Sequence, residues 1–240
     1  SRKTLYAVPS DVPLQGGKFT VDGQVRYIDA AAFQTVHGLT RIALPKNLEK
    51  VYEGYPTIVP TSSFTAFEIP AGAPHFKVID GVLFRGTTLV LYPRGRDATN
   101  YTVPNGIKAI TNYAISSNSK LESINLNGVT KLVKSSIYNA SKLTSITLPQ
   151  NLKPYDDVTG DGMSEGCFEA CSNLTEYKVH PQNKDFVAVG GVLFSKDMKT
   201  LYFYPGSKMG TTYTIPQSVE VIAGHAFQSA KYITTMHIPA

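Results

Sequence analysis

The sequence is poor in the residues on which disulfide frameworks, membrane spans and charged disordered tails depend. It has two cysteines in 240 residues, too few for a disulfide framework. No apolar run approaches the roughly 20 residues that a membrane-spanning helix needs. Charged residues make up 17% of the chain and hydrophobic residues 42%, which excludes a disordered acidic or basic tail. The composition agrees with a folded, soluble, β-rich chain. The architecture of that chain must be inferred from the pattern within the sequence.

We expect the sequence to be part of a longer native protein. The chain starts with Ser1 rather than methionine and has no secretory leader, so we expect a mature fragment or a trimmed piece of a longer chain. It stops at 238–240, on an expected strand with no polar cap. Because repeat arrays need caps, we expect more chain to follow in the native protein.

One apolar pattern repeats along the chain. The apolar positions of Leu121–Leu126 recur 22 residues later in Leu143–Leu148. A longer template matches four times, starting at Val25, Ile107, Val129 and Val219. Self-similarity at a period of this size indicates a solenoid. A single match of this kind would be weak evidence, but four matches in one chain are strong.

The spacing within the repeat predicts its geometry. In Leu143–Leu148 the pattern ends in alternation, so Ile146 and Leu148 point inward while Thr147 points outward, as in a strand. One such strand cannot bury its own apolar side, and stacking successive strands builds a parallel sheet over a continuous core. The small-aromatic pair Ala32-Phe33 then lies on the opposite wall, where the small residue permits a tight turn.

The repeats predict one array with nine rungs. The last inward strand positions are Val21, Leu44, Ile69, Val103, Leu126, Leu148, Val179, Ile215 and Ile238. Nine rungs give a rod roughly 40 Å long. We therefore expect an irregular lead-in or cap over residues 1–16 and a single array over 17–240. The third rung is irregular, because Tyr55-Pro56 replaces the small-aromatic pair.

Two segments, 76–93 and 186–205, are one module used twice. Asp80-Gly81 and Gly190-Gly191 are two-residue turn signals between alternating apolar runs, as in tight hairpins. A second turn follows in each segment, so we predict two β-hairpin or meander modules that protrude from the array. A polar loop, Pro154–Gly162, interrupts another rung.

These residues resemble the BspA-type leucine-rich repeats of bacterial surface proteins. The resemblance rests on Leu143–Pro149, Val103–Ile110 and Cys167–Leu174, and on the two modules at Gly81–Pro93 and Gly191–Pro205. It covers nearly the whole chain after residue 17. The fold expected is a leucine-rich-repeat solenoid, formally α/β but β-rich. It is a right-handed coil with a parallel sheet on one face, short helical or irregular turns opposite, and the two inserted modules.

The resemblance also implies a function. It implies a secreted or cell-surface, non-enzymatic adhesion role. Some such proteins bind extracellular-matrix proteins of the host, others have no assigned ligand, and the family shares no catalytic residues. The implied protein has no cofactor, and we expect a monomer. A glycan-binding accessory protein and a structural spacer are the alternatives. Val129 stands where ordinary leucine-rich repeats carry Asn or Cys, so no ladder of buried amides is expected.

The candidate ligand-binding residues are the outward strand positions. They are rich in Ser, Thr and Asn, and the extended sheet of a solenoid suits a protein or glycan ligand. The residues selected are Arg41, Glu68, Asn125, Thr147, Lys178, Thr214 and His237. Thr also suits a half-exposed strand by propensity alone, so function is not the only explanation. Exposed aromatic contacts are expected at Tyr92, Tyr204 and Tyr213, and the modules themselves could carry recognition.

Other motifs have structural explanations. Gly162–Gly166 matches the G-x-S-x-G nucleophile elbow, but a polar loop precedes it instead of a buried strand, so we predict no catalytic site. The acidic loop at 156–161 lacks the downstream acid of an EF-hand, so we predict no metal site. Cys167 and Cys171 occupy small-residue positions and are expected to be buried free thiols.

The net charge of +5 does not by itself indicate a nucleic-acid ligand. Lysines are spread along the expected turns, as on a solvated surface. Arg85, Arg94 and Arg96 form the tightest cluster and could attract an acidic partner. No nucleic-acid-binding motif accompanies them, so we expect no nucleic-acid partner.

Overall fold

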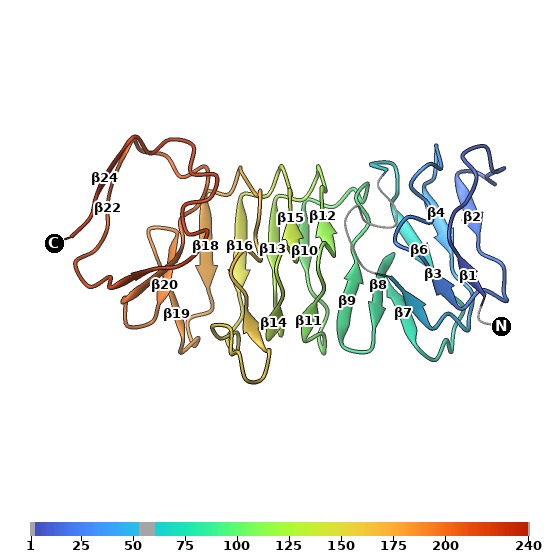
Figure 1. Ribbon diagram of the computed structural model, residues 1–240, viewed down its shortest axis with the longest axis horizontal. Helices are drawn as coiled ribbons and strands as arrows, with labels where there is room; N and C mark the ends of the chain where they lie inside the picture. The colour runs from blue at the N-terminus through green and yellow to red at the C-terminus, as the bar shows by residue number, and fades with distance from the viewer. Residues whose placement is uncertain (1–2, 53–60, 240) are drawn as a thin grey trace.

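The computed structural model describes residues 3–52 and 61–239, and these residues form an elongated β-solenoid (Figure 1). The N- and C-termini lie at opposite ends of the long axis. The described residues contain 24 strands and no helix. The predicted β-rich leucine-rich-repeat solenoid is confirmed, and of the helical or irregular turns that were expected, the described residues have irregular turns and two-residue strands. The irregular third rung at Tyr55-Pro56 lies outside the described residues.

Nine strands form the first face, one for each predicted rung. They are β2 (Lys18–Thr20), β4 (Arg41–Ala43), β6 (Ala66–Glu68), β10 (Asn100–Thr102), β13 (Ser123–Asn125), β16 (Ser145–Leu148), β18 (Glu176–Val179), β22 (Thr212–Thr214) and β24 (Thr235–His237). Pairing is parallel and keeps inward residues aligned, as in Tyr101↔Ile124↔Ile146. The strands do not form one continuous sheet. They form three: β2-β4-β6, β10-β13-β16-β18 and β22-β24.

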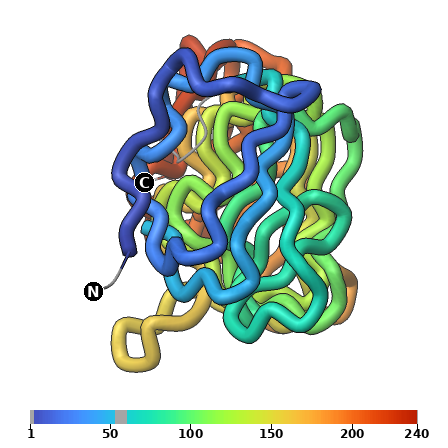
Figure 2. The backbone as a smooth tube through the Cα atoms, turned by 90° about the vertical axis from the view of Figure 1, so that its right-hand side faces the viewer, coloured from blue at the N-terminus to red at the C-terminus, as the bar shows by residue number. Residues whose placement is uncertain are grey.

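Shorter strands form the second face. They are β1 (Thr4–Leu5), β3 (Tyr27–Ile28), β5 (Lys50–Val51), β7 (Phe76–Ile79), β8 (Val82–Arg85), β9 (Thr88–Leu91), β11 (Ala109–Ile110), β14 (Lys131–Leu132), β17 (Gly162–Met163), β19 (Phe186–Val189), β20 (Val192–Ser195), β21 (Thr200–Phe203) and β23 (Val221–Ile222). A third wall holds the parallel pair β12 (Ile115–Ser116) and β15 (Ile137–Tyr138). The end-on view in Figure 2 shows the coils stacked behind one another, with the loop near residues 155–160 projecting from them.

The corners of the third wall are turned by left-handed residues. The residue before the small position has positive φ at Tyr113, Ser135 and Gly166, with values of 55°, 55° and 70°. The small residue that follows, such as Ala114, is buried and leaves room for the next side chain to enter the core. The predicted role of the small-aromatic pair is confirmed by Ala32 and Phe33, which are 1% and 0% exposed.

The two modules are antiparallel meanders, as predicted, but they do not protrude. In the first, β7 pairs with β8 and β8 with β9, and β9 then pairs parallel with β11 of the second face. The second module repeats this order with β19, β20, β21 and β23. Side chains of the middle strand, from Val82 to Phe84, are fully buried. The modules lie in the array because their apolar alternation fills the core.

The hairpin turns of the modules interrupt the first face. The carbonyl oxygen of Gly81 accepts a hydrogen bond of 2.9 Å from the N–H of Phe67 on β6. Gly191 accepts the equivalent bond from Tyr177 on β18, also at 2.9 Å. Each turn thus takes the place where the next parallel strand would pair. This explains why nine strands are divided among three sheets.

Two single buried asparagines brace the coil. The amide nitrogen of Asn183 donates to the carbonyl oxygens of Pro149 and Leu152 at 2.7 and 3.1 Å. Its amide oxygen accepts from the N–H groups of Asp185 and Phe186. Asn118 makes the same four-way arrangement after the first module. The sequence had indicated only that no amide ladder forms, and it did not indicate these two braces.

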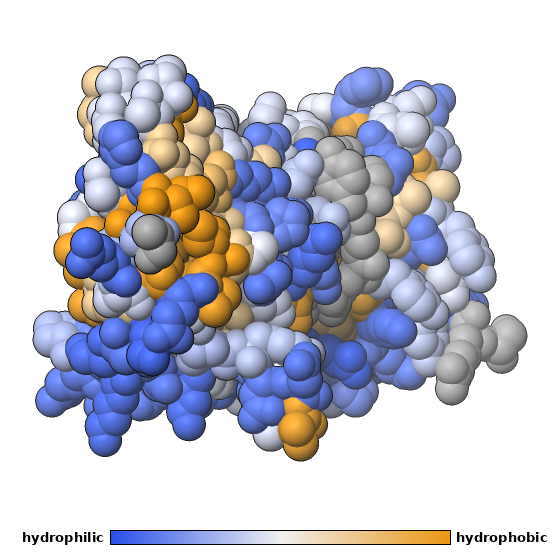
Figure 3. Space-filling view, turned by 60° about the vertical axis from the view of Figure 1, so that its left-hand side comes forward, coloured by the Kyte–Doolittle hydropathy of each residue, from blue (hydrophilic) through white to orange (hydrophobic). Residues whose placement is uncertain are grey.

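The N-terminal end of the described chain has a paired strand, and the C-terminal end has exposed apolar side chains. Near the N-terminus, β1 pairs with β3, so Thr4 and Leu5 already belong to the second face. At the C-terminal end apolar side chains gather on the surface (Figure 3), and Val221, Ile222 and Ile238 are 54%, 42% and 68% exposed. Residues 3–52 and 61–239 include no helix with the length and hydropathy of a membrane span.

Candidate binding surface

The structure divides the seven predicted ligand-binding residues among the three sheets of the first face. Arg41 and Glu68 stand on β4 and β6, and Thr214 and His237 stand on β22 and β24. The other three, Asn125, Thr147 and Lys178, are adjacent across β13, β16 and β18. All seven are exposed or half-exposed. Their role in binding stays a prediction. The central three form a row across three strands, whereas Thr214 and His237, and likewise Arg41 and Glu68, form separate pairs.

The central sheet is the most regular part of the first face. Parallel register places Asn125 beside Thr147 and Thr147 beside Lys178, and a second row places Ser123 beside Ser145. Strands in such a sheet lie about 4.8 Å apart, so the outward groups form a ladder with that repeat. Short hydroxyl and amide groups can both donate and accept hydrogen bonds. The surface can therefore satisfy an extended polar ligand at several successive points.

The charged residues of the first face are largely paired with one another. Glu68 lies within ion-pair distance of both Lys18 and Arg41, at 2.5 and 3.8 Å. Lys178 Nζ lies 2.9 Å from Glu176 Oε1, two residues away on the same strand. Exposed pairs of this kind are worth less than about 1 kcal/mol. They leave the face close to neutral, so hydrogen bonding and shape dominate what it can recognise.

A hollow of about 350 Å³ lies beside the central sheet where the second module begins. Its lining includes Lys178, His180 and Lys196, together with the module turn at Gly191. The hollow exists because the hairpin turn replaces a full strand next to β18. It gives the otherwise flat first face one concave position.

Two of the three tyrosines expected as exposed contacts are buried. Tyr92 and Tyr204 are 1% and 4% exposed, because each ends a module strand whose side chain turns into the core. Tyr213 is half-buried, with its ring centroid 4.8 Å from that of Tyr204. Burial raises the pKa of Tyr213 to about 12, with the nearby Tyr204 as a second cause. The rings of Tyr92 and Tyr204 therefore pack in the core, and only Tyr213 keeps part of its surface exposed.

The cysteines and the acidic loop have structural roles. Cys167 and Cys171 are free and buried, as predicted. Burial raises the pKa of Cys171 to about 11 and that of Cys167 well above its usual value, so both are protonated thiols at neutral pH. The Asp156 carboxylate accepts hydrogen bonds from the N–H groups of Val158 and Thr159, and these bonds lower its pKa. Over residues 3–52 and 61–239, no three acidic, histidine or cysteine side chains are grouped to hold a metal.

The arginine cluster of the first module is partly used within the chain. Arg96 pairs with the carboxylate and carbonyl oxygens of Asp80. The Arg85 guanidinium lies 5.9 Å from the centre of the Phe76 ring. These contacts reduce what the cluster can offer to an acidic partner.

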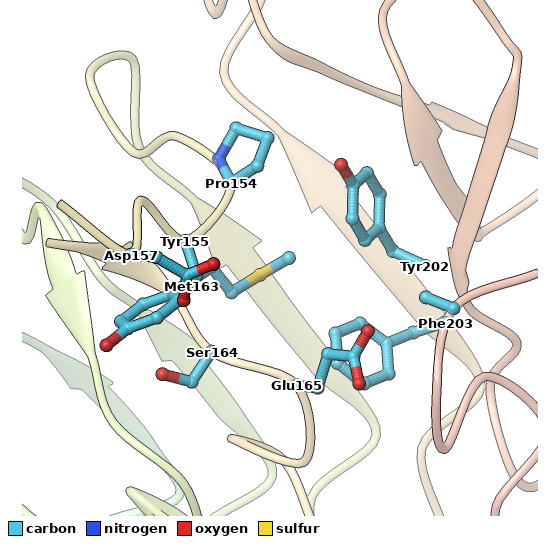
Figure 4. Close-up of a pocket in the computed structure, with 9 residues that line it drawn as sticks. Pro154, Tyr155, Asp157, Met163, Ser164, Glu165, Tyr202 and Phe203 are labelled. Carbon is cyan, nitrogen blue, oxygen red and sulfur yellow. The ribbon is translucent and has the colours of Figure 1, made fainter. Parts of the chain in front are cut away.

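The sequence analysis missed a groove on the second face. It is the largest of the cavities described, about 570 Å³, and Tyr155, Met163 and Tyr202 line it with the carboxylates of Asp157 and Glu165 (Figure 4). Ser164, the central residue of the G-x-S-x-G match, also lines it, but no histidine does. One signal was available: the second module has Tyr202 where the first has Val90.

The family of the chain follows from its repeats. The model of the BspA type leucine rich repeat region matches six copies, over residues 16–88 and 94–199. The matched residues cover well over half of the chain, so the protein belongs to the BspA-type leucine-rich-repeat family. No curated protein sequence matches the chain.

Two solved structures share the fold. A leucine rich cell surface protein from Faecalibacterium prausnitzii is 18% identical with a TM-score of 0.61, and the match covers 91% of this chain and 52% of that one. A leucine-rich repeat protein from Eubacterium ventriosum is 16% identical with a TM-score of 0.51, covering 93% and 48% respectively. This chain therefore spans about half the length of each protein it resembles.

Proposed function

We propose that this protein is a non-enzymatic module, secreted or displayed at a cell surface, that binds a host or matrix protein through its first face. Membership of a repeat family of surface proteins supports this role. The observation that carries it is the in-register ladder of exposed hydroxyl and amide groups across β13, β16 and β18. A rigid, nearly neutral ladder is suited to an extended partner segment.

The test is binding of the purified chain to immobilised fibronectin, fibrinogen, mucin and common polysaccharides at physiological salt. Thr147→Arg places a long charged side chain at the centre of the ladder and should weaken a protein signal at least tenfold. Ala109→Arg is the matched control, because Ala109 is half-exposed on β11 of the second face. It should leave the signal unchanged.

Other outcomes would redirect the proposal. A saturable signal from polysaccharides alone favours the glycan-binding alternative. Equal loss in Thr147→Arg and Ala109→Arg, with both variants folded, would contradict binding through the first face. If none of the immobilised ligands binds, the result favours a structural spacer that holds other parts of a longer protein away from the surface.

A further inference from the structure

Two grooves on the second face occupy equivalent places in the fold. Each lies where a short strand gives way to a module: β5 precedes the first and β17 precedes the second. The N-terminal groove, of about 320 Å³, is lined by Lys50, Val51, Tyr52, Phe76, Arg85 and Val90. The C-terminal groove is the larger one, lined by Tyr155, Asp157, Met163, Ser164, Glu165 and Tyr202 among others. Because the modules are repeats, the two grooves can be compared position by position.

In the N-terminal groove, cations of the chain itself lie near the aromatic rings. Lys50 Nζ lies 4.4 Å from the ring centroid of Tyr52. Arg85 Cζ lies 5.9 Å from the ring centroid of Phe76. A cation within about 6 Å of a ring face is attracted by the negative face of the aromatic system. This groove thus shows which chemical group the geometry accepts: a lysine or arginine head on an aromatic wall.

The C-terminal groove lacks both cations, and its aromatic residues differ, because Ser164 replaces Tyr52 and Phe186 is fully buried outside the lining. In the register of the sheets, Gly162 replaces Lys50 and Ser195 replaces Arg85. Phe186 takes the place of Phe76, and its ring centroid lies 5.2 Å from that of Tyr202. Tyr202 itself stands where the first module has a valine. Tyr155, Tyr202 and Phe203 supply the aromatic lining of this groove, and no lysine or arginine is among the residues that line it.

The C-terminal groove is also negative, in a chain whose net charge is +5. Asp157 and Glu165 line it, and neither is in any ion pair found among residues 3–52 and 61–239. Burial raises the pKa of the Tyr202 phenol, and the charges of Asp197, Asp185 and Glu165 raise it further. Tyr155 and Asp157 lie on one side of the groove and Tyr202 on the other, with the Met163 side chain between them and Glu165 beside Phe203 (Figure 4). The walls are thus aromatic and the charges unpaired.

We propose that the C-terminal groove binds a lysine or arginine side chain presented by a partner protein. The apolar stem packs on Tyr202 and Met163, and the charged head lies beside Glu165, with Asp157 adding negative charge from the other side of the groove. A neutral sugar could stack on the same rings, but it would leave both carboxylates without a counter-charge. The site is on the second face. A test that contradicts binding through the first face would therefore leave this proposal intact, and the reverse also holds.

Methyl NMR on the chain labelled at methionine provides a direct test. Met163 lines the groove, while Met198, Met209 and Met236 do not and serve as internal controls. The probes are Nα-acetyl-lysinamide, Nα-acetyl-argininamide and the uncharged analogue Nα-acetyl-norleucinamide. We expect the two cationic probes to shift the Met163 signal saturably, the norleucine probe to leave it in place, and 0.5 M salt to weaken binding.

Two variants separate the contribution of the aromatic ring of Tyr202 from that of the carboxylate of Glu165. Tyr202→Val installs the residue of the N-terminal groove, so the fold should persist while affinity for the lysine probe falls about threefold or more. Glu165→Gln removes one charge and should weaken binding by about two- to fivefold. Glu122→Gln, an exposed carboxylate outside the groove, is the matched control and should bind like the parent chain.

Several results would overturn the assignment. An equal Met163 shift from the norleucine probe would mean that the groove recognises only the apolar stem. A shift from methyl β-glucoside or N-acetylglucosamine without one from the cationic probes would make it a sugar site. Binding of free butylamine, but not of the peptide Gly-Gly-Lys-Gly-Gly, would replace the partner protein with a small amine ligand.

Discussion

Adjacent residues on one strand of this protein have opposite environments. Ile146 on β16 is completely buried, whereas its neighbour Thr147 is half-exposed on the first face. The alternation follows from the two-residue period of a strand, and it is what separates stability from recognition in a solenoid. The same separation holds at every first-face strand of the central sheet.

Replacing these neighbours tests the inward and outward assignment. Ile146→Ala should lower the free energy of unfolding by about 2–5 kcal/mol, because it leaves a cavity between packed rungs. Thr147→Ala should change it by less than about 0.5 kcal/mol. Urea denaturation followed by circular dichroism measures both, and similar losses in the two variants would show that the strand phase is inverted.

Asn183 is expected to contribute substantially to the stability of the fold although its side chain is polar. It is 1% exposed and joins two backbone carbonyls to two backbone N–H groups across the coil. Asn183→Ala should cost about 2–4 kcal/mol, because buried groups of the main chain lose their partners. Asn173→Ala is the matched control, since Asn173 is half-buried and donates to one backbone carbonyl, that of Ser141. A comparable loss of stability in both variants would contradict the bracing role.

At the scale of elements, the hairpin turns decide how the first face is divided. Gly191 has a φ of +82°, and a Cβ there would lie 3.0 Å from Cβ and 3.1 Å from Cα of Glu176. The close approach lets the turn accept the hydrogen bond from β18. A glycine is required by both the backbone conformation and the contact.

Gly191→Ala should therefore destabilise the protein by about 2 kcal/mol or more, through left-handed strain and the clash with β18. Gly190→Asp is the control in the same turn. Gly190 faces open space apart from Lys208 Nζ at 3.8 Å, and the first module carries Asp80 at this position. It should cost less than about 1 kcal/mol. Equal costs, measured by chemical denaturation, would mean that the turn does not pack on the first face.

At the scale of the whole molecule, stability is expected to vary along the rod. Each rung of a solenoid is held by its neighbours, so an end rung with exposed apolar residues has fewer stabilising contacts. Val221 and Ile222 on β23 are more than 40% exposed, whereas the equivalent Leu132 on β14 is fully buried. The C-terminal end and the centre therefore differ in burial although they share one repeat.

Amide hydrogen exchange should resolve this gradient. We expect the N–H groups of β22 and β24 to exchange at least tenfold faster than those of β13 and β16, because the C-terminal rungs open without unfolding the centre. Uniform protection along the chain would instead indicate a single cooperative unit.

The sequence by itself determined the repeat, the nine first-face strands, the buried thiols and the two meanders. Each depends on local periodicity or on turn residues such as Gly190-Gly191, which act over a few positions. Only the tertiary structure decided that the modules lie within the array, that Gly81 and Gly191 divide the first face, and that Tyr155 meets Tyr202 across a groove. These features join residues tens of positions apart, and their geometry depends on how the coils stack, which no local pattern encodes.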